Sequence, residues 1–239
     1  MVDGPAGDLV ISFSSVGHDA GRAPSPEFVA TATGRGTAHP RRALFVMDES
    51  RSWASDPAFA PTLQTALTRV AALAPVGRIA TIGLSMGAFA ALAAMQFLPV
   101  SAALAFGPQW SPLLPGESRW ADWTSSLSAL PPAQGASPQG PGLEGALAKA
   151  PPLVASLPGP GQGWACLFHG LVDDRDQALA FPLKNGTDHL LFPDQSHASL
   201  VPHLKSRGLL AGLMEAALAG DRRRLIRLAT SAGGERRRA

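Results

Sequence analysis

Residues 78–93, RIATIGLSMGAFAALA, decide the fold of this chain. Residues 78–84 read as an apolar strand, and residues 86–97 form an alanine-rich helical pattern. Between them lies GLSMG at 83–87, which has the pattern G-x-S-x-G. A strand before this pattern and a helix after it predict a sharp turn that exposes the Ser85 hydroxyl as a nucleophile.

The two glycines of this turn have a physical role. A serine in such a turn adopts a strained backbone conformation, and a glycine two residues to either side removes a Cβ that would collide with the strand or the helix. The alanines that follow allow the helix to lie close to the sheet. The helix N-terminus then directs the Met86 N–H toward any oxyanion that forms at Ser85. Met86 is therefore expected to be one donor of an oxyanion hole.

Apolar runs of strand length alternate with helical patterns along the chain. The expected strands are residues 8–13, 43–48, 78–84, 101–106, 164–168 and 189–192, and the expected helices are residues 62–73, 86–97 and 202–219. Such alternation predicts a three-layer α/β/α domain with a mostly parallel sheet of about six strands. We expect a single domain over residues 1–220, with its functional groups at the carboxyl ends of the strands.

A nucleophilic serine needs a base, and the chain has six histidines. His197 follows the last expected strand, within residues 193–198, at the sheet edge where Ser85 is expected. We therefore expect His197 to be the base, although a capping or surface histidine would suit the same position. His169 ends the fifth expected strand, and we interpret it as a packing residue or a support for the site.

Three aspartates in residues 169–176, HGLVDDRD, compete to orient His197. An orienting carboxylate fixes the tautomer of the base and stabilises its protonated form. The spacing H-G-x-x-D favours Asp173, whereas a shift of one residue at the strand end would favour Asp174. Asp176 is expected to start or cap the next helix. Asp173 and Asp174 both remain candidates.

The turn after the first expected strand should supply a second oxyanion donor. This turn reads FSSVG at residues 13–17. Its position in the chain makes the Ser15 N–H the expected donor. The alternative is a simple serine-rich turn without a role in catalysis.

Residues 111–163 interrupt the alternation of strands and helices. This stretch contains ten of the 22 prolines, together with Trp120 and Trp123. A long irregular insertion after the fourth strand would lie over the carboxyl edge of the sheet, where we expect it to act as a cap. Trp110, Trp120 and Trp123 are therefore candidates for the lining of a substrate pocket. Pinning the loops to the core is an equally good interpretation of these tryptophans.

The composition is that of a globular protein, because 46% of the 239 residues are apolar and 16% are charged. A single cysteine, Cys166, excludes an internal disulfide and fits a cytoplasmic location, which we expect here. No stretch is long and apolar enough to span a membrane, and the N-terminus does not resemble a secretory signal. The sequence also has no phosphate-binding loop motif and no zinc-ligand spacing, so we expect no cofactor and no metal.

The net charge of +2 is unevenly distributed. Residues 221–239 carry seven arginines against Asp221 and Glu235, so the rest of the chain is net negative. A basic tail could bind nucleic acid or an anionic membrane. Because no aromatic residue lies between the arginines, we interpret the tail as a solvated helix end with a frayed terminus. We expect no nucleic-acid partner.

These motifs together resemble the α/β-hydrolase superfamily over most of residues 8–219, including its chain order of serine, aspartate and histidine. The resemblance implies a Ser-His-Asp triad that acts through an acyl-enzyme. Two features depart from the superfamily. The first expected strand corresponds to the strand that is normally third, so we expect a sheet without the leading antiparallel hairpin, and the Ser14-Ser15 turn stands where His-Gly is usual.

Four short stretches also resemble small bacterial hydrolase-like proteins that accompany surface-polysaccharide genes. They are residues 13–15, 48–53, 105–109 and 174–175. In this narrower resemblance the Asp174-Arg175 pair is the matching feature, which favours Asp174 over Asp173.

The expected function is the hydrolysis of a carboxylic ester or thioester. The same residues could transfer an acyl group to a sugar hydroxyl, because both reactions share the acyl-enzyme. A binding module on a hydrolase scaffold is a third possibility, against which the presence of Ser85, His197 and the aspartates argues. The expected partner is a small-molecule or saccharide acyl substrate, and the sequence does not determine the oligomeric state.

Overall fold

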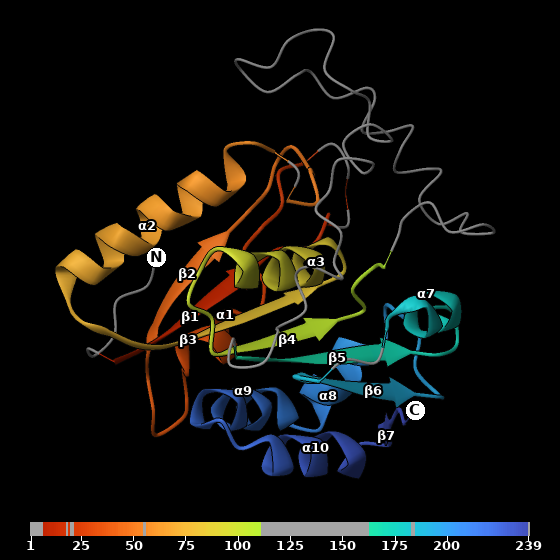
Figure 1. Cartoon of the computed structure of the whole chain (residues 1–239). Coiled ribbons are helices and arrows are strands. Elements are labelled where there is room, and N and C mark those ends of the chain that lie inside the picture. The colour runs from red at the N-terminus through yellow and green to blue at the C-terminus, as the bar shows by residue number, and fades with distance from the viewer. Residues whose placement is uncertain are drawn as a thin grey trace, which may run out of the picture.

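The computed structural model describes residues 7–17, 19, 22–54, 56–110, 163–182 and 185–238. Its centre is a seven-stranded sheet of order β2-β1-β3-β4-β5-β6-β7 (Figure 1). Every pair of neighbouring strands is parallel except β6 and β7. The strands are β1 (Gly7–Phe13), β2 (Arg42–Val46), β3 (Val76–Leu84), β4 (Ala102–Phe106), β5 (Trp164–Gly170), β6 (Thr187–Phe192) and β7 (Glu235–Arg236).

Helices cover both faces of the sheet, which gives the three layers expected from the sequence (Figure 1). On one face lie α2 (Phe59–Leu73) and α3 (Met86–Ala93), which continues into the short 3₁₀ helix η1 (Ala94–Gln96). On the other face lie α1 (Val29–Thr33), α8 (Leu200–Ser206), α9 (Leu209–Ala219) and α10 (Arg222–Ser231). Among the described residues there is also α7 (Arg175–Ala180), which follows β5.

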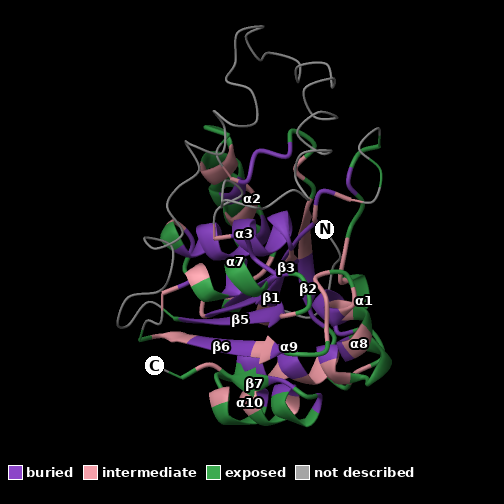
Figure 2. Cartoon of the chain, turned by 90° about the vertical axis from the view of Figure 1, so that its right-hand side faces the viewer, coloured by how far each residue is buried: buried purple, intermediate pink, exposed green. Residues whose placement is uncertain are grey.

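Alternating side chains of one strand fill two separate cores. Leu9, Ile11 and Phe13 of β1 belong to the hydrophobic cluster under α2 and α3. Val10 belongs to the opposite cluster, with residues of α8, α9 and α10. Successive side chains of a strand point to opposite faces, so a continuous apolar run is what a strand buried on both faces requires. Figure 2 shows β1, β3 and β5 buried within the molecule.

The six strands expected from the sequence are present, and the predicted fold class is confirmed. The expected helix over residues 202–219 is instead two helices, α8 and α9. The helical backbone is interrupted between them at Gly208, whose φ of 69° lies in the left-handed region that favours glycine. The short helix α1 was not expected, because its five residues show no clear periodicity. The helix expected to start near Asp176 is present as α7.

The basic tail differs from its interpretation as a solvated helix end with a frayed terminus. Residues 222–231 form α10, whose Leu225 and Ala229 are buried against the core, and residues 235–236 form the seventh strand, β7. The strand β7 was not expected, because its two residues are too few to show a strand pattern. Residues 221–239 therefore include elements that complete the fold.

Two arginines of this segment neutralise a buried carboxylate. Asp188 of β6 has a fully buried side chain, and its Oδ2 lies 2.8 Å from Arg222 NH2. Arg236 NH2 lies 2.7 Å from Asp188 Oδ1, an ion pair without the angles of a hydrogen bond. A buried carboxylate is costly unless it is paired, so the arginines of α10 and β7 are required by a charge on the central sheet.

Most of the expected cap, residues 111–162, lies outside the described residues. Within the part of the chain that the structure describes, no helix is long and apolar enough to cross a membrane.

The ion pairs of Asp188 generate a prediction about stability. The double variant Arg222→Ala/Arg236→Ala leaves the buried carboxylate unpaired and should lower the free energy of unfolding by roughly 3 kcal/mol, at the lower end of the range for broken buried pairs because both arginines are partly exposed. Urea unfolding measures the loss.

The matched control removes the same charge from the same segment without touching Asp188. Arg223 and Arg238 are exposed, so Arg223→Ala/Arg238→Ala should change the free energy of unfolding by less than about 0.5 kcal/mol. Equal losses in the two double variants would contradict the role assigned to the ion pairs.

Candidate active site

Ser85 lies at the junction of β3 and α3, as the sequence predicts. Its backbone has φ 58° and ψ −124°, a conformation that costs a non-glycine residue about 1–3 kcal/mol. The Ser85 N–H donates to the Phe106 carbonyl oxygen at 2.8 Å, and the Ser85 carbonyl accepts from the Ala88 N–H at 2.9 Å. Bonds to β4 on one side and to α3 on the other hold this strained residue, which is 4% exposed.

The two glycines of GLSMG are sites of backbone contact. A Cβ at Gly83 would lie 2.2 Å from the Gly87 carbonyl carbon, and a Cβ at Gly87 would lie 2.3 Å from the Phe13 carbonyl oxygen. Both distances are shorter than any real Cβ contact. The helix α3 therefore packs backbone to backbone against β3 and the end of β1, which only glycine permits.

His197 and Asp174 form a hydrogen-bonded pair. His197 Nδ1 lies 2.5 Å from Asp174 Oδ2, and the two side chains are 19% and 3% exposed. A carboxylate can only accept, so Nδ1 carries the proton and Nε2 is the basic nitrogen. The neighbouring Asp173 makes a different contact, because its Oδ1 accepts from the His197 backbone N–H at 2.6 Å. Asp176 lies in the first turn of α7, which begins just before it.

Gly107, at the end of β4, fits closely against the pair of His197 and Asp174. A Cβ at Gly107 would lie 2.7 Å from His197 Nδ1 and 3.2 Å from Asp174 Oδ2. Gly107 also has a φ of +54°, in the region that favours glycine. The imidazole thus lies over the end of the strand next to β3. Between the described residues Ser85 and His197 no hydrogen bond is formed.

The Ser85 hydroxyl instead accepts a hydrogen bond from Gln109, whose Nε2 lies 3.0 Å from Oγ. Sequence reasoning did not identify Gln109 as a site residue. The signal was available, because Gln109 follows β4 at the same carboxyl edge of the sheet as Ser85 and His197. What the sequence could not supply is the direction of this side chain.

The two expected oxyanion donors lie on neighbouring backbone segments. Met86 is the first residue of α3, and Ser15 lies just beyond β1. The backbone of Gly87 approaches Phe13 and Ser14 closely, since a Cβ there would lie 2.9 Å from the Ser14 carbonyl carbon. Neither the Met86 N–H nor the Ser15 N–H donates to any other residue of the described chain. The Ser15 hydroxyl donates to Glu27 Oε1 at 2.5 Å.

Of the three tryptophans expected to line a pocket, only Trp110 falls within the described residues. Its backbone N–H donates to Gln177 Oε1 at 2.7 Å, and its ring packs edge-on against Phe181 with centroids 5.2 Å apart. These contacts tie Trp110 to α7 and the residue after it. Trp120 and Trp123 lie outside the described residues.

Two buried histidines support the loop that carries Gln109. His169 Nε2 lies 2.9 Å from the Pro108 carbonyl oxygen, which can only accept, so Nε2 donates. His169 Nδ1 then accepts from His189 Nε2 at 2.8 Å. On the far side of His189, Arg237 NH1 lies 3.5 Å from Nδ1 and also donates to the Phe181 carbonyl at 2.8 Å. This chain of hydrogen bonds links the C-terminal segment to Pro108.

Burial lowers the pKa of both imidazoles. The pKa of His169 falls to about 4, because loss of hydration outweighs the opposing effect of the Asp174 carboxylate. The pKa of His189 falls to about 2, through burial first and then through the nearby His169 and Arg237. Both imidazoles are therefore neutral at pH 7, as the directions of their hydrogen bonds require.

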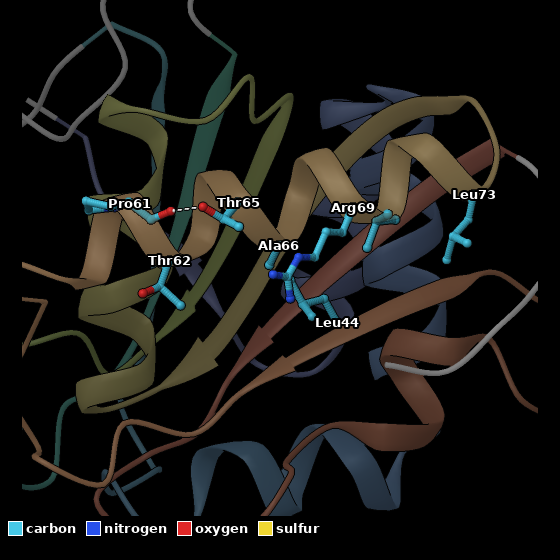
Figure 3. Close-up of a pocket in the computed structure, with 8 residues that line it drawn as sticks. Leu44, Pro61, Thr62, Thr65, Ala66, Arg69 and Leu73 are labelled. Atoms are coloured by element: carbon cyan, nitrogen blue, oxygen red, sulfur yellow. Dashed lines mark hydrogen bonds between the residues drawn. The ribbon is translucent and has the colours of Figure 1, made fainter. Parts of the chain in front are cut away.

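A groove on the surface of the described residues lies away from this site. It is a groove of about 520 Å³ between α2 and the edge strand β2, with Leu44, Arg69 and Leu73 among its walls (Figure 3). The Thr65 hydroxyl there donates to the Pro61 carbonyl oxygen at 2.8 Å. None of Ser85, His197 and Asp174 lines this groove.

No family model matches the chain, and no curated protein matches its sequence. Solved structures do match it. The 2,6-dihydroxy-pseudo-oxynicotine hydrolase superposes with a TM-score of 0.58 at 16% identity, over 92% of this chain and 63% of that chain. The acylaminoacyl peptidase of Pyrococcus horikoshii superposes with a TM-score of 0.57 at 15% identity, over 91% of this chain and 38% of that chain.

An esterase from Pyrococcus furiosus superposes with a TM-score of 0.56 at 12% identity, over 89% of this chain and 83% of that chain. This chain thus spans less than two thirds of the hydrolase and of the peptidase, and most of the esterase. At such identities the likeness concerns the arrangement of strands and helices.

The neutral histidines generate a prediction about pH. In the unfolded chain an imidazole has its ordinary pKa of about 6.5, so below that pH the unfolded state binds more protons than the folded state. The free energy of unfolding should therefore fall as the pH is lowered from about 6.5 to about 5, by at most about 1.4 kcal/mol per pH unit for each histidine. Urea unfolding at several pH values measures this slope.

Two variants separate these histidines from other titrating groups. His189→Gln removes one buried imidazole and should flatten the slope, whereas His39→Gln removes an exposed imidazole and should leave it unchanged. A slope that is the same in His189→Gln as in the unaltered protein would show that the buried pair does not govern acid stability.

Proposed function

Given that this chain has the α/β-hydrolase fold, we propose that it is a serine hydrolase of carboxylic esters or thioesters. One observation carries the proposal. The strained Ser85 lies at the N-terminus of α3, and at the same sheet edge His197 is paired through Nδ1 with the buried carboxylate of Asp174 at 2.5 Å. A base whose second nitrogen has no partner among the described residues, at the same sheet edge as a serine on a strained turn, suits the activation of a hydroxyl.

In the proposed first step, Ser85 Oγ attacks the acyl carbon and its proton passes to His197 Nε2. Asp174 keeps the imidazole in the required tautomer and stabilises the imidazolium. The proton then moves to the departing alcohol or thiol, which leaves an acyl-enzyme on Oγ. Water attacks this ester by the same route in reverse, and Oγ regains its proton from His197.

This reaction requires Oγ and His197 Nε2 to come into contact when the substrate binds. Catalytic hydrogen bonds are often long or absent without substrate, so their absence in the free protein is compatible with the proposal. Any side chain at position 107 would collide with the imidazole, because a Cβ there would lie 2.7 Å from His197 Nδ1.

The N–H groups of Met86 and Ser15 are the proposed donors to the oxyanion. Both belong to backbone that converges beside Ser85, and neither donates elsewhere among the described residues. Met86 has the further advantage of the helix N-terminus, where unpaired N–H groups and the helix dipole favour negative charge.

We propose Asp174, and not Asp173, as the acid of the triad. The Asp174 carboxylate contacts the imidazole, whereas Asp173 contacts the backbone N–H of the same residue. Asp173 is then a positioning residue that fixes the backbone of His197. The sequence did not decide between the two aspartates, because they are adjacent. A shift of one residue at the strand end would exchange the directions of their side chains.

The first test concerns the nucleophile. Ser85→Ala should abolish turnover of the nitrophenyl esters, acyl-thioesters or acetylated sugars that the unaltered protein cleaves, because it removes the hydroxyl that forms the acyl-enzyme. A fluorophosphonate probe should label the unaltered protein at Ser85, as located by peptide mass spectrometry. Labelling confined to a different serine, or full turnover by Ser85→Ala, would overturn the assignment.

The second test compares the two aspartates as a matched pair. Asp174→Asn should lower kcat by about 10²- to 10⁴-fold, since an amide fixes the wrong tautomer of His197. Asp173→Asn retains an oxygen that can accept from the His197 N–H, so its loss should be roughly tenfold or less. The reverse order of losses would assign the acid to Asp173.

A further inference from the structure

We infer that Gln109 is a further catalytic residue, whose side-chain amide donates a hydrogen bond to Ser85 Oγ during acyl transfer. The inference rests on the proposed function, which makes Oγ the reacting atom. Gln109 is 1% exposed, and its Nε2 lies 3.0 Å from Ser85 Oγ. The same Nε2 lies 3.1 Å from the Gly107 carbonyl oxygen, so both N–H bonds of the amide have acceptors.

Trp53 determines which end of the amide faces Ser85. The indole Nε1–H can only donate, and it lies 3.2 Å from Gln109 Oε1. Because the amide oxygen accepts from Trp53, the NH₂ group must face the serine. Trp53 is itself 1% exposed and has a φ of 49°, so a strained backbone presents this indole to Gln109.

The loop that carries Trp53 is held by the buried side chain of Arg51. The Arg51 guanidinium donates to the carbonyl oxygens of Val16 at 3.1 Å and Arg22 at 2.7 Å. These bonds join the loop after β2 to the loop after β1, and they hold Trp53 in position to reach a residue that follows β4.

The backbone around Gln109 is fixed on both sides. The Gly107 N–H donates to the Phe168 carbonyl at 2.7 Å, and the Pro108 carbonyl accepts from His169 at 2.9 Å. The Trp110 N–H donates to Gln177 at 2.7 Å. With its backbone and its amide oxygen both held, Gln109 cannot easily turn its NH₂ group away from Ser85. The donor is therefore already in place before any substrate arrives.

The chemistry of this donor follows from the state of Oγ. A hydrogen bond from Gln109 occupies one lone pair and leaves the Oγ proton for His197 Nε2. As the Oγ–acyl bond forms, the oxygen gives up its proton while still bearing part of a negative charge, which the N–H stabilises. When the acyl-enzyme breaks down, Oγ is the leaving group and bears partial charge again. Gln109 neither gains nor loses a proton in either step.

The expected contribution is smaller than that of an oxyanion-hole donor. Loss of one such donor costs about 10²- to 10³-fold in kcat. Charge on Oγ is partial and brief, since His197 takes the proton as the bond forms. Removing the amide of Gln109 should therefore slow attack by Ser85 by roughly 10- to 100-fold.

The experiment measures how fast a fluorophosphonate bearing a fluorophore labels Ser85. In this reaction the Oγ–P bond forms, the P–F bond breaks, fluoride leaves, and the Oγ proton passes through His197 to solvent. Gln109→Met keeps the length of the side chain but removes both N–H donors, and its second-order labelling rate should fall by about 10- to 100-fold. Thermal unfolding establishes that the variant is folded at the temperature of the assay.

A second variant of the same shape keeps the inference testable if the methionine variant does not fold. Gln109→Glu retains an acceptor for Trp53 but presents an acceptor to Oγ when it is ionised, so labelling should be slow at about pH 8. The protonated carboxyl can donate again, so the ratio of this variant's rate to the unaltered rate should rise as the pH is lowered toward about 6. A ratio near one at both pH values would overturn the inference.

A double-mutant cycle tests whether Trp53 acts through Gln109. Trp53→Phe alone should slow labelling by a few-fold, because the amide loses the partner that orients it. In the Gln109→Met background the same change should have no further effect on the labelling rate. Two effects that simply multiply would show that Trp53 does not act by orienting the amide.

The outcomes separate this inference from the proposed function. If the probe does not label Ser85 in the unaltered protein, the proposed function fails and Gln109 has no reaction to assist. If the probe labels Ser85 in the unaltered protein and labels the folded Gln109→Met variant at the same rate, the role of Gln109 fails alone.

Discussion

The close approach of three backbone segments at Ser85 is the constraint on which the rest of the structure depends. The start of α3 lies directly on β3 and on the end of β1, at distances that exclude a Cβ on Gly83 or Gly87. This contact places the strained serine above the sheet and brings the Met86 N–H beside the turn that contains Ser15. Ala88, Ala90 and Ala91, which follow in α3, are all buried there.

Polar groups around this junction are buried and paired in a consistent direction. Trp53 donates to Gln109, which donates to Ser85, and His169 donates to the carbonyl of Pro108 between them. The direction of these hydrogen bonds is fixed because the Trp53 indole can only donate and the Pro108 carbonyl can only accept. A network with one permitted pattern is rigid, which suits the proposed active site.

The predictable part of the fold was the part with a strong local pattern. Apolar runs located β1 to β6, because a parallel sheet covered on both faces needs continuous hydrophobic strands. The tail was misjudged for the opposite reason. Arg222 and Arg236 look like a solvated surface in the sequence, and only their contact with the buried Asp188 explains them. Asp188 itself gave little warning, because it lies just before the strand expected over residues 189–192.

The sequence by itself determined the turn at Ser85, since only glycines at 83 and 87 fit the close contacts of a strand, a sharp turn and a helix. It also placed His197 and the two aspartates at one sheet edge, because parallel strands end together. Tertiary structure alone decided which aspartate faces the imidazole and that Gln109 reaches Ser85. Side-chain direction in a loop depends on contacts with residues distant in the chain, such as Trp53 and His169, and no local pattern records them.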